Sequence, residues 1–179
     1  MPAESALVVL IPEAEVAVES FRKRFDPSAA LGLRAHVTIL YPFKRPAELT
    51  PNVIDELAEL FSKTPPFDVS FSESKYFSSV FYLVPSPDGP FRRLTEIVSQ
   101  QFPENRPYGG EFREIVPHLT VAQADDSLLL VKIASEFEDH AESLLPIRSS
   151  VTEVALLDNE SGRWQVRKNF DLKICDGGK

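Results

Sequence analysis

The chain has 179 residues, of which 43% are apolar and 26% are charged, and its formal net charge is −8. This composition is ordinary for a globular protein, and the length allows one domain with a proper core. No apolar run approaches the roughly 20 residues that cross a bilayer, and proteins that hold long polynucleotides by their phosphates are usually basic. We therefore expect no membrane partner and no extended nucleic-acid surface, but a small molecule or a nucleic-acid end bound by a few local cations.

The ends of the sequence favour a cytoplasmic location. The first residues lack a basic segment and become acidic after a short apolar run, unlike a signal peptide. Cys175 is the only cysteine, which excludes an internal disulfide framework and a cysteine-rich metal site. We expect a cytoplasmic monomer.

The first half of the chain predicts the order strand, helix, strand, helix, strand. Thr50 and Pro51 are typical of a helix start, a capping residue followed by proline at the first helical position. Alternating apolar residues predict a half-buried strand after this helix. The expected elements are a strand over 5–12, a helix over 13–25, a strand within 35–43, a helix from 51 with Val53, Ile54, Leu57, Leu60 and Phe61 on one face, and a strand over 65–77.

The second half predicts the same order again. Its expected elements are a strand over 78–85, a helix over 89–102, a strand within 116–123, a helix over 126–145, a strand over 146–157, a turn over 159–162 and a strand over 163–174 with Trp164, Val166, Phe170 and Leu172 on one face.

The two halves share landmarks at similar offsets. Pro12 and Pro85 are 73 positions apart, His36 and His118 are 82 apart, and the offset between Pro66 and Pro146 is 80. The extra residues before the second histidine fall in a stretch rich in proline and glycine, 103–114, which predicts a loop. We expect one α/β (α+β) domain over 1–179, made of two pseudo-symmetric β-α-β-α-β lobes, about 3–77 and 78–174.

Each half carries a histidine and a threonine two positions apart in a predicted strand. These are His36 and Thr38 in the first half, and His118 and Thr120 in the second. Residues at i and i+2 of a strand point to the same face, so each pair can line a cleft while its neighbours are buried. In a duplicated fold, the cleft receives one imidazole and one hydroxyl from each side.

Such a cleft suits phosphodiester chemistry. The reference pKa of imidazole is about 6.5, so near neutral pH one histidine can take a proton and the other can donate one. Threonine hydroxyls can donate hydrogen bonds to the non-bridging oxygens of a phosphate. The predicted catalytic residues are His36, Thr38, His118 and Thr120. A structural role for the two histidines is the alternative.

With these two motifs, "HVT" at 36–38 and "HLT" at 118–120, the sequence resembles the 2H phosphoesterase superfamily over nearly its whole length. That group includes 2′-5′ RNA ligase-like proteins and cyclic phosphodiesterases, and "HVTILYPF" looks closer to its YjcG-like branch than to the RNA ligase-like enzymes. The resemblance implies a bilobal fold whose mainly antiparallel sheets flank a central cleft. It also implies metal-independent action on 2′,3′-cyclic phosphates or 2′-5′ linkages of small nucleotides or RNA termini. Gln123 stands where the ligase-like enzymes often have arginine.

Further candidates surround the motifs. Tyr108 and Arg113, in the loop over 103–114, could close over substrate and contact it, and Lys44 follows the first motif directly. Each has the alternative of an ordinary solvated side chain. His140 is expected to be exposed on its helix.

No cofactor or metal is expected. Zinc sites need three or four protein ligands, whereas the two motifs supply two histidines and no cysteine. We expect an enzyme of the cyclic phosphodiesterase or 2′-5′ RNA ligase-like type. A non-catalytic binder of nucleotides or RNA ends, and RNA 2′-5′ ligase activity, are the alternatives.

Overall fold

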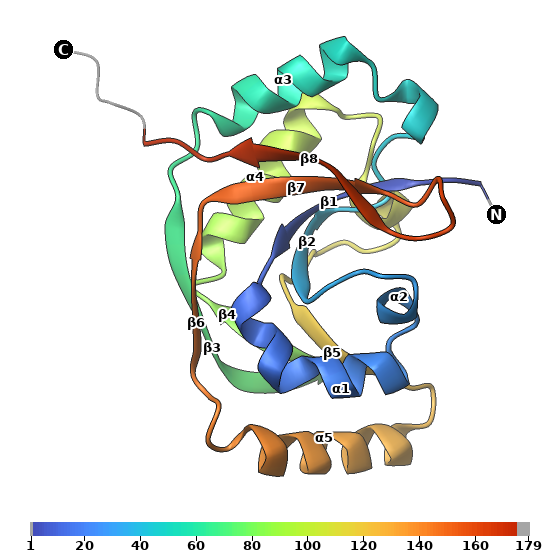
Figure 1. Ribbon diagram of the computed structural model, residues 1–179, viewed down its shortest axis with the longest axis vertical. Helices are drawn as coiled ribbons and strands as arrows, with labels where there is room; N and C mark the ends of the chain where they lie inside the picture. Colours follow the sequence, from blue (N-terminus) through green and yellow to red (C-terminus); the bar gives the residue numbers. More distant parts are fainter. Residues whose placement is uncertain (1, 175–179) are drawn as a thin grey trace.

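The structure, a computed structural model, describes residues 2–174, so Cys175 lies outside the described part. It contains two four-stranded sheets and five α-helices (Figure 1). The strands are β1 (Ser5–Leu10), β2 (His36–Leu40), β3 (Phe67–Phe77), β4 (Val80–Ser86), β5 (Leu119–Gln123), β6 (Ile147–Val151), β7 (Glu153–Asp158) and β8 (Gln165–Asp171). The helices are α1 (Glu15–Phe25), α2 (Pro27–Ala30), α3 (Pro51–Phe61), α4 (Gly89–Gln101) and α5 (Ser127–Ala141), with 3₁₀ turns η1 (Pro12–Ala14), η2 (Pro46–Glu48) and η3 (Pro107–Gly110).

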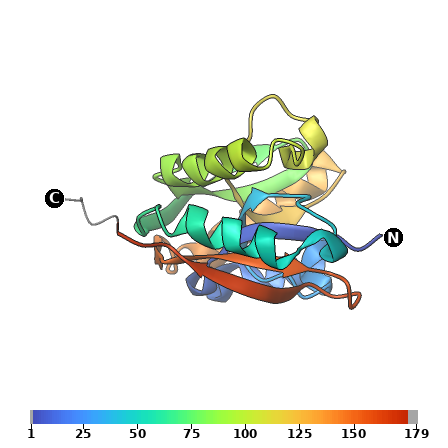
Figure 2. The same ribbon diagram turned by 90° about the horizontal axis from the view of Figure 1, so that it is seen from above.

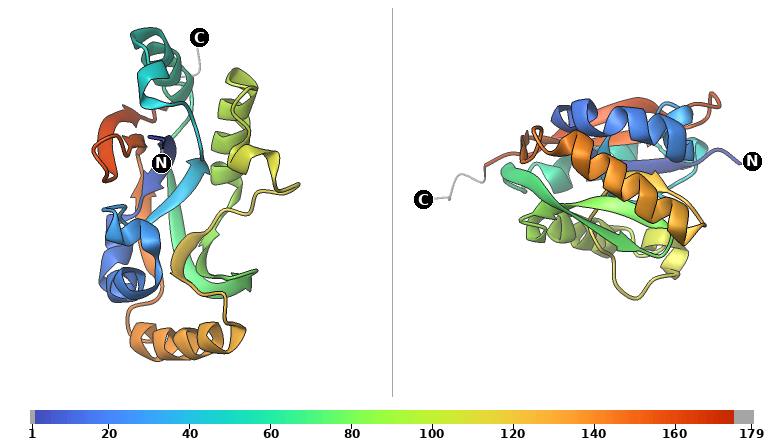
Figure 3. Two further views of the ribbon diagram at one scale, coloured as in Figure 1. Left: turned by 90° about the vertical axis from the view of Figure 1, so that its right-hand side faces the viewer. Right: turned by 90° about the horizontal axis from the view of Figure 1, so that it is seen from below.

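Both sheets are antiparallel, which confirms the predicted fold class. The order in the first sheet is β2-β1-β7-β8, and the order in the second is β5-β4-β3-β6. Strands β2 and β5 are therefore edge strands. They lie beside each other at the centre of the molecule (Figure 3), so the two sheets meet along the two histidine strands.

The sheets do not coincide with the two contiguous lobes expected from the sequence. Strand β3 closes the first predicted unit, yet it pairs with β4 and β6 in the second sheet. Strand β7, near the end of the second unit, pairs with β1 in the first sheet. Each unit thus gives a strand to the sheet of the other, and the division at 77/78 is not the division between sheets.

The strand expected over 146–157 is two strands. Its first part, β6, pairs with β3, and its second part, β7, pairs with β1 and β8. The chain changes sheets at Thr152, between them. This crossing joins the two sheets on the side away from β2 and β5, as the continuous orange path in Figure 1 shows.

The main core lies between the sheets and their helices. Helix α1 packs against β5 and α4 packs against β2, so each helix contacts the histidine strand of the other half. The two helices lie on opposite sides of the molecule in Figure 2, α4 in green and α1 in blue. Phe137 of α5 contacts both Phe21 of α1 and Phe81 of β4, with ring centroids 5.3 and 5.6 Å apart. These buried aromatic rings join α5, α1 and β4 in the core.

The predicted start of α3 is confirmed. The Thr50 side chain accepts a hydrogen bond from the backbone N–H of Val53, and Pro51 is the first helical residue. Within residues 2–174, no helix combines the length and the apolar character that a bilayer crossing needs.

Candidate active site

The two histidines occupy equivalent places at the junction of the sheets. His36 is the first residue of β2, and His118 directly precedes β5. Thr38 lies opposite Val8 of β1, and Thr120 lies opposite Tyr82 of β4. All four side chains of the motifs are half-buried, so they are held by packing yet remain reachable from solvent.

Both imidazoles are oriented in the same way. Nδ1 of His36 is 2.6 Å from the carbonyl oxygen of Arg34, and Nδ1 of His118 is 2.7 Å from the carbonyl oxygen of Val116. A carbonyl oxygen can only accept, so in each neutral ring the proton is on Nδ1 and Nε2 has a free lone pair. Two histidines therefore present Nε2 to the junction, each fixed by the carbonyl two residues before it.

The pKa of each histidine is lowered. Burial lowers the pKa of His36 to about 4, helped by the nearby positive charge of Arg22 and, more weakly, by His118, while the hydrogen bond to Arg34 and the charge of Asp26 oppose the shift. Burial likewise lowers the pKa of His118 below its usual 6.5, opposed by the hydrogen bond to Val116. The electrostatic effect of His118 on His36 also indicates that the rings are close in space.

Aromatic rings surround His118. Its ring centroid is 5.0 Å from that of Phe77 and 5.6 Å from that of Tyr82, both with edge-on geometry. Burial raises the pKa of the Tyr82 phenol. Neither residue was predicted from the sequence to lie in the site. The available signal was the alternation of β4, which puts Tyr82 on the face opposite to the buried Phe81 and Leu83.

Tyr108 lies against the first motif. Burial raises the pKa of its phenol, and the nearby side chain of Thr38 partly offsets that effect. Its backbone N–H donates to the carbonyl oxygen of Tyr41 at 2.6 Å, which fixes the loop to the end of β2. Tyr108 adopts a left-handed conformation with φ of 51°, so the loop reaches Thr38 through an unusual backbone geometry.

The other two candidate substrate contacts differ in their placement. Arg113 is exposed in the same loop and, within residues 2–174, has no hydrogen bond or ion pair. Lys44 forms an ion pair of 2.6 Å with Glu104 and lies over the ring of Phe102. It lies beyond the end of β2, where its carbonyl oxygen accepts from Ser5 at the start of β1. His36 lies opposite Leu10 at the other end of β1, roughly 16 Å along that strand. The structure does not bring Lys44 to the histidines.

A buried ion pair next to His36 was also missed from the sequence. Nε and Nη2 of Arg22 are each 3.0 Å from Oδ2 of Asp26, and both side chains are almost fully buried. Asp26 also accepts hydrogen bonds from the backbone and the hydroxyl of Ser28 at the start of α2. The i, i+4 spacing on α1 was the available signal, but it does not distinguish a buried pair from an exposed one.

Two further expectations concerned metal ligands and the third histidine. Within the described 2–174 range, no three histidine, cysteine, aspartate or glutamate side chains are gathered so that they could hold a metal ion. His140 is exposed on α5, away from both motifs, as expected.

Comparison with known proteins gives consistent matches. The model of the 2′-5′ RNA ligase superfamily matches residues 11–163. A Geobacillus kaustophilus protein with a provisional phosphoesterase name is 29% identical over 178 residues, which cover 96% of each chain. A Bacillus cereus protein with a similar name is 30% identical over 164 residues, 84% of this chain and 86% of that protein.

Solved structures share the architecture. Escherichia coli LigT complexed with 3′-AMP gives a TM-score of 0.61 at 16% identity, covering 97% of this chain and all of LigT. TT0787 of Thermus thermophilus gives a TM-score of 0.63 at 18% identity, and the match covers 95% of this chain and 98% of TT0787. At such low identity these likenesses show the fold alone.

Proposed function

The chain belongs to the 2′-5′ RNA ligase superfamily, and we propose that it is a metal-independent phosphodiesterase acting on nucleotides or RNA ends. The proposed reaction opens 2′,3′-cyclic phosphates or 2′-5′ phosphodiester bonds. One observation carries the proposal: His36 and His118 lie at the starts of two adjacent edge strands, and each has a threonine two residues later. Nδ1 of each imidazole is within hydrogen-bond distance of a backbone carbonyl oxygen. The LigT structure that holds 3′-AMP, a small nucleotide, supports this substrate class.

The proposed step is an in-line displacement at phosphorus. One neutral histidine takes a proton through Nε2 from water, whose oxygen bonds to phosphorus. The ribose oxygen leaves from the opposite side and receives the proton of the other histidine, which yields a phosphomonoester. Thr38 and Thr120 donate hydrogen bonds to the non-bridging oxygens, so the ester is held between the two rings.

The low pKa of both histidines makes the charge of the substrate important. In the free protein near neutral pH, both rings are mostly neutral, and a phosphodiester anion placed between them favours the protonated form. Substrate binding therefore supplies the proton arrangement that the reaction needs. The two pKa values set the two limbs of the pH profile, but the profile alone does not identify which histidine is the base.

Turnover of 2′,3′-cyclic nucleotides in excess EDTA tests the proposal. We expect a bell-shaped plot of kcat/KM against pH, because one histidine must be protonated and the other neutral. The activity rises as pH passes about 4, where His36 loses its proton, and falls as pH passes the pKa of His118, below 6.5. The measurement is initial rate from pH 3.5 to 8, at substrate concentrations below KM. A rate that EDTA abolishes, or no product with any cyclic nucleotide, would contradict the proposal.

We also propose that Tyr108 and Arg113 contact substrate. The phenol of Tyr108 lies near Thr38, so a phosphate that reaches Thr38 must meet the phenol as well. Arg113 is an exposed cation in the same loop. We expect Tyr108→Phe and Arg113→Gln each to raise KM for a cyclic nucleotide severalfold, with kcat changed less, since each removes a binding contact. Arg93→Gln on the outer surface of α4 is the control. Unchanged KM in both loop variants would remove the loop from the substrate site.

A further inference from the structure

The face of the second sheet that carries His118 extends well beyond the histidines. Tyr82, Val84 and Ser86 share one face of β4, because they alternate with Phe81, Leu83 and Pro85, which are buried on the other face. Exposure on the first face increases along the strand, from the buried Tyr82 to the exposed Ser86. Tyr82 contacts the ring of His118, so Ser86 lies on the same open face as the candidate active site. Ser86 is four positions after Tyr82, which corresponds to about 13 Å along the strand.

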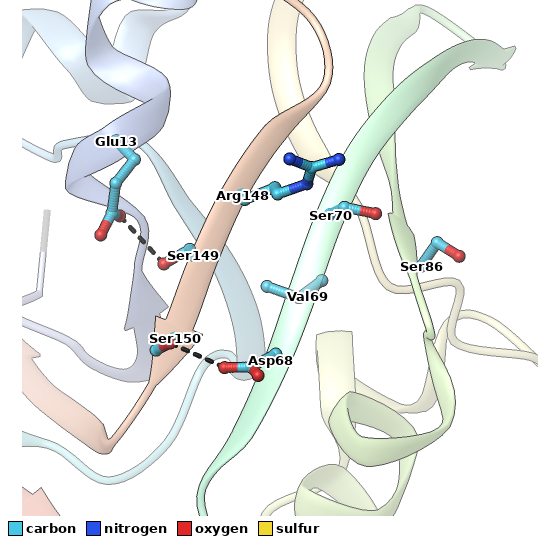
Figure 4. A pocket seen from close by; sticks show the side chains of 8 residues that line it. All are labelled: Glu13, Asp68, Val69, Ser70, Ser86, Arg148, Ser149 and Ser150. Atoms are coloured by element: carbon cyan, nitrogen blue, oxygen red, sulfur yellow. Dashed lines mark hydrogen bonds between the residues drawn. The ribbon is translucent and has the colours of Figure 1, made fainter.

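Three donor side chains form a row across this distant end of the face. Ser70 of β3 lies opposite Ser86 of β4 on one side and opposite Arg148 of β6 on the other. Directly opposed residues in antiparallel strands have neighbouring side chains. The three line a pocket of about 560 Å³, and Figure 4 shows the guanidinium of Arg148 extending over β3 next to Ser70.

The donors of this row have no partner in the protein. Across the described residues 2–174, Arg148 forms no ion pair or hydrogen bond, and neither do the hydroxyls of Ser70 and Ser86. The two remaining serines of the pocket are different, because Ser149 donates to Glu13 and Ser150 donates to Asp68, at 2.9 and 2.7 Å. A guanidinium and two hydroxyls that all lack acceptors are a donor set suited to a phosphate.

We propose that Arg148, Ser70 and Ser86 bind a backbone phosphate of a single-stranded oligoribonucleotide whose 3′ end lies at the two histidines. This inference rests on the proposed function for the reacting end and adds the substrate class: an RNA oligonucleotide and not a mononucleotide. The row is too far from the histidines for a single nucleotide to span, whereas the nucleotides on the 5′ side of the reacting phosphate can cross the open face.

The surface between the two sites fits this path. Lys75 of β3 is exposed and lies opposite Tyr82, on the same face and between the histidines and the row. Its ammonium is a second cation for a phosphate on the path. Such local cations reconcile an anionic ligand with the net charge of −8.

Carboxylates also line the pocket, and their negative charge should weaken the binding of a phosphate. Asp68 is two residues from Ser70 on the same face, and Glu13 lies on the other side of β6, bonded to Ser149 (Figure 4). Glu73 is exposed on the open face between the row and Lys75. Asp68 repels a phosphate at Arg148, so Asp68→Asn should strengthen binding while the amide oxygen still accepts from Ser150.

The test is binding, which needs no turnover. The probe is a hexaribonucleotide with a 5′ fluorophore and a 3′-phosphate, titrated by anisotropy, with a 3′-mononucleotide compared by calorimetry. We expect Arg148→Gln to weaken hexamer binding about tenfold and to leave mononucleotide binding unchanged. A plot of the logarithm of the hexamer association constant against the logarithm of salt concentration has a negative slope. In Arg148→Gln this slope should be less steep by about 0.7, the contribution of one phosphate contact in a single strand. Asp68→Asn should lower the Kd of the hexamer.

The control is Arg93→Gln, which removes an equally exposed arginine from α4. If wild type does not bind the hexamer, or if Arg148→Gln and Arg93→Gln bind it as wild type does, the proposed phosphate site is wrong. If no cyclic phosphate is turned over but hexamer binding still depends on Arg148, the proposed function fails and the phosphate site stands. The two proposals can therefore fail separately.

Discussion

Replacement of His36 or His118 with alanine is expected to lower kcat/KM for 2′,3′-cyclic nucleotides at least about a hundredfold, the typical contribution of one general acid or base. Each Nε2 faces the junction of β2 and β5 with its lone pair free, because Nδ1 is already bonded to a backbone carbonyl. Alanine removes the proton carrier but leaves Thr38 and Thr120 in place. The measurement is initial rate at the pH optimum, with thermal melting to show that each variant is folded.

The third histidine of the chain provides the matched control. His140 is exposed on α5, so His140→Ala should keep the wild-type rate. The double variant of His36 and His118 should lose little more than either single variant, because the two rings act in one step and losses in such a unit are not additive. Full activity in both single variants would remove the histidines from the chemistry and leave a nucleotide-binding role.

Much of the site could be predicted because it depends on local pattern. A histidine and a threonine two residues apart on a strand share a face whatever the tertiary structure, so the pairing of His36 with Thr38 needed no coordinates. Tyr108 was a candidate from sequence because its loop, rich in glycine and proline, leads into the strand of the second motif. The structure places it instead against the first motif, where its backbone bonds to Tyr41 and its phenol lies near Thr38.

The sheet assignment could not be predicted in the same way. The segment 146–157 contains no glycine, and its only proline begins it, so nothing local marks Thr152 as the point where the chain changes sheets. The prediction that Val166 and Phe170 share one face of β8 was wrong for a related reason. A register shift opposite Leu156 and Leu157 puts Val166 and Phe170 on opposite faces, although strict alternation gives them the same one. Both features depend on pairing partners that are distant in sequence.

Lys44 and Arg22 show why charged residues near a motif are hard to interpret from sequence. Lys44 directly follows the strand of the first motif, yet it pairs with Glu104 at the end remote from His36. Arg22 is 14 positions before His36, yet its positive charge is the second largest cause of the lowered pKa of that histidine. Proximity in space is set by how α1 packs, which its apolar spacing indicates only in outline.

Asp26→Ala is expected to lower the free energy of unfolding by about 3–5 kcal/mol, the cost of leaving one member of a buried ion pair without its partner. Arg22 and Asp26 have side chains only 3% and 2% exposed, so water cannot solvate the guanidinium after the carboxylate is gone. The same change removes the hydrogen bonds from Asp26 to Ser28 that begin α2. For a chain of this size the melting temperature should fall by roughly 6–20 °C.

Two further variants test whether the broken ion pair causes the loss of stability in Asp26→Ala. Glu19→Ala breaks an exposed ion pair with Lys23 on the same helix, and it should leave the melting temperature almost unchanged. Arg22→Met combined with Asp26→Asn removes both charges, so it should be less destabilising than Asp26→Ala alone. A melting temperature of Asp26→Ala equal to that of Glu19→Ala would show that the buried pair does not stabilise the fold.

The same variant should change the chemistry of the site. Asp26 raises the pKa of His36, whereas Arg22 lowers it, so loss of the carboxylate leaves the lowering effect of Arg22 unopposed. The pKa of His36 in Asp26→Ala should therefore be lower than the value of about 4 in the wild type. In the pH profile the acidic limb should move to lower pH while the limb governed by His118 stays in place. An acidic limb that does not move would show that the ion pair stabilises the fold without tuning the histidine.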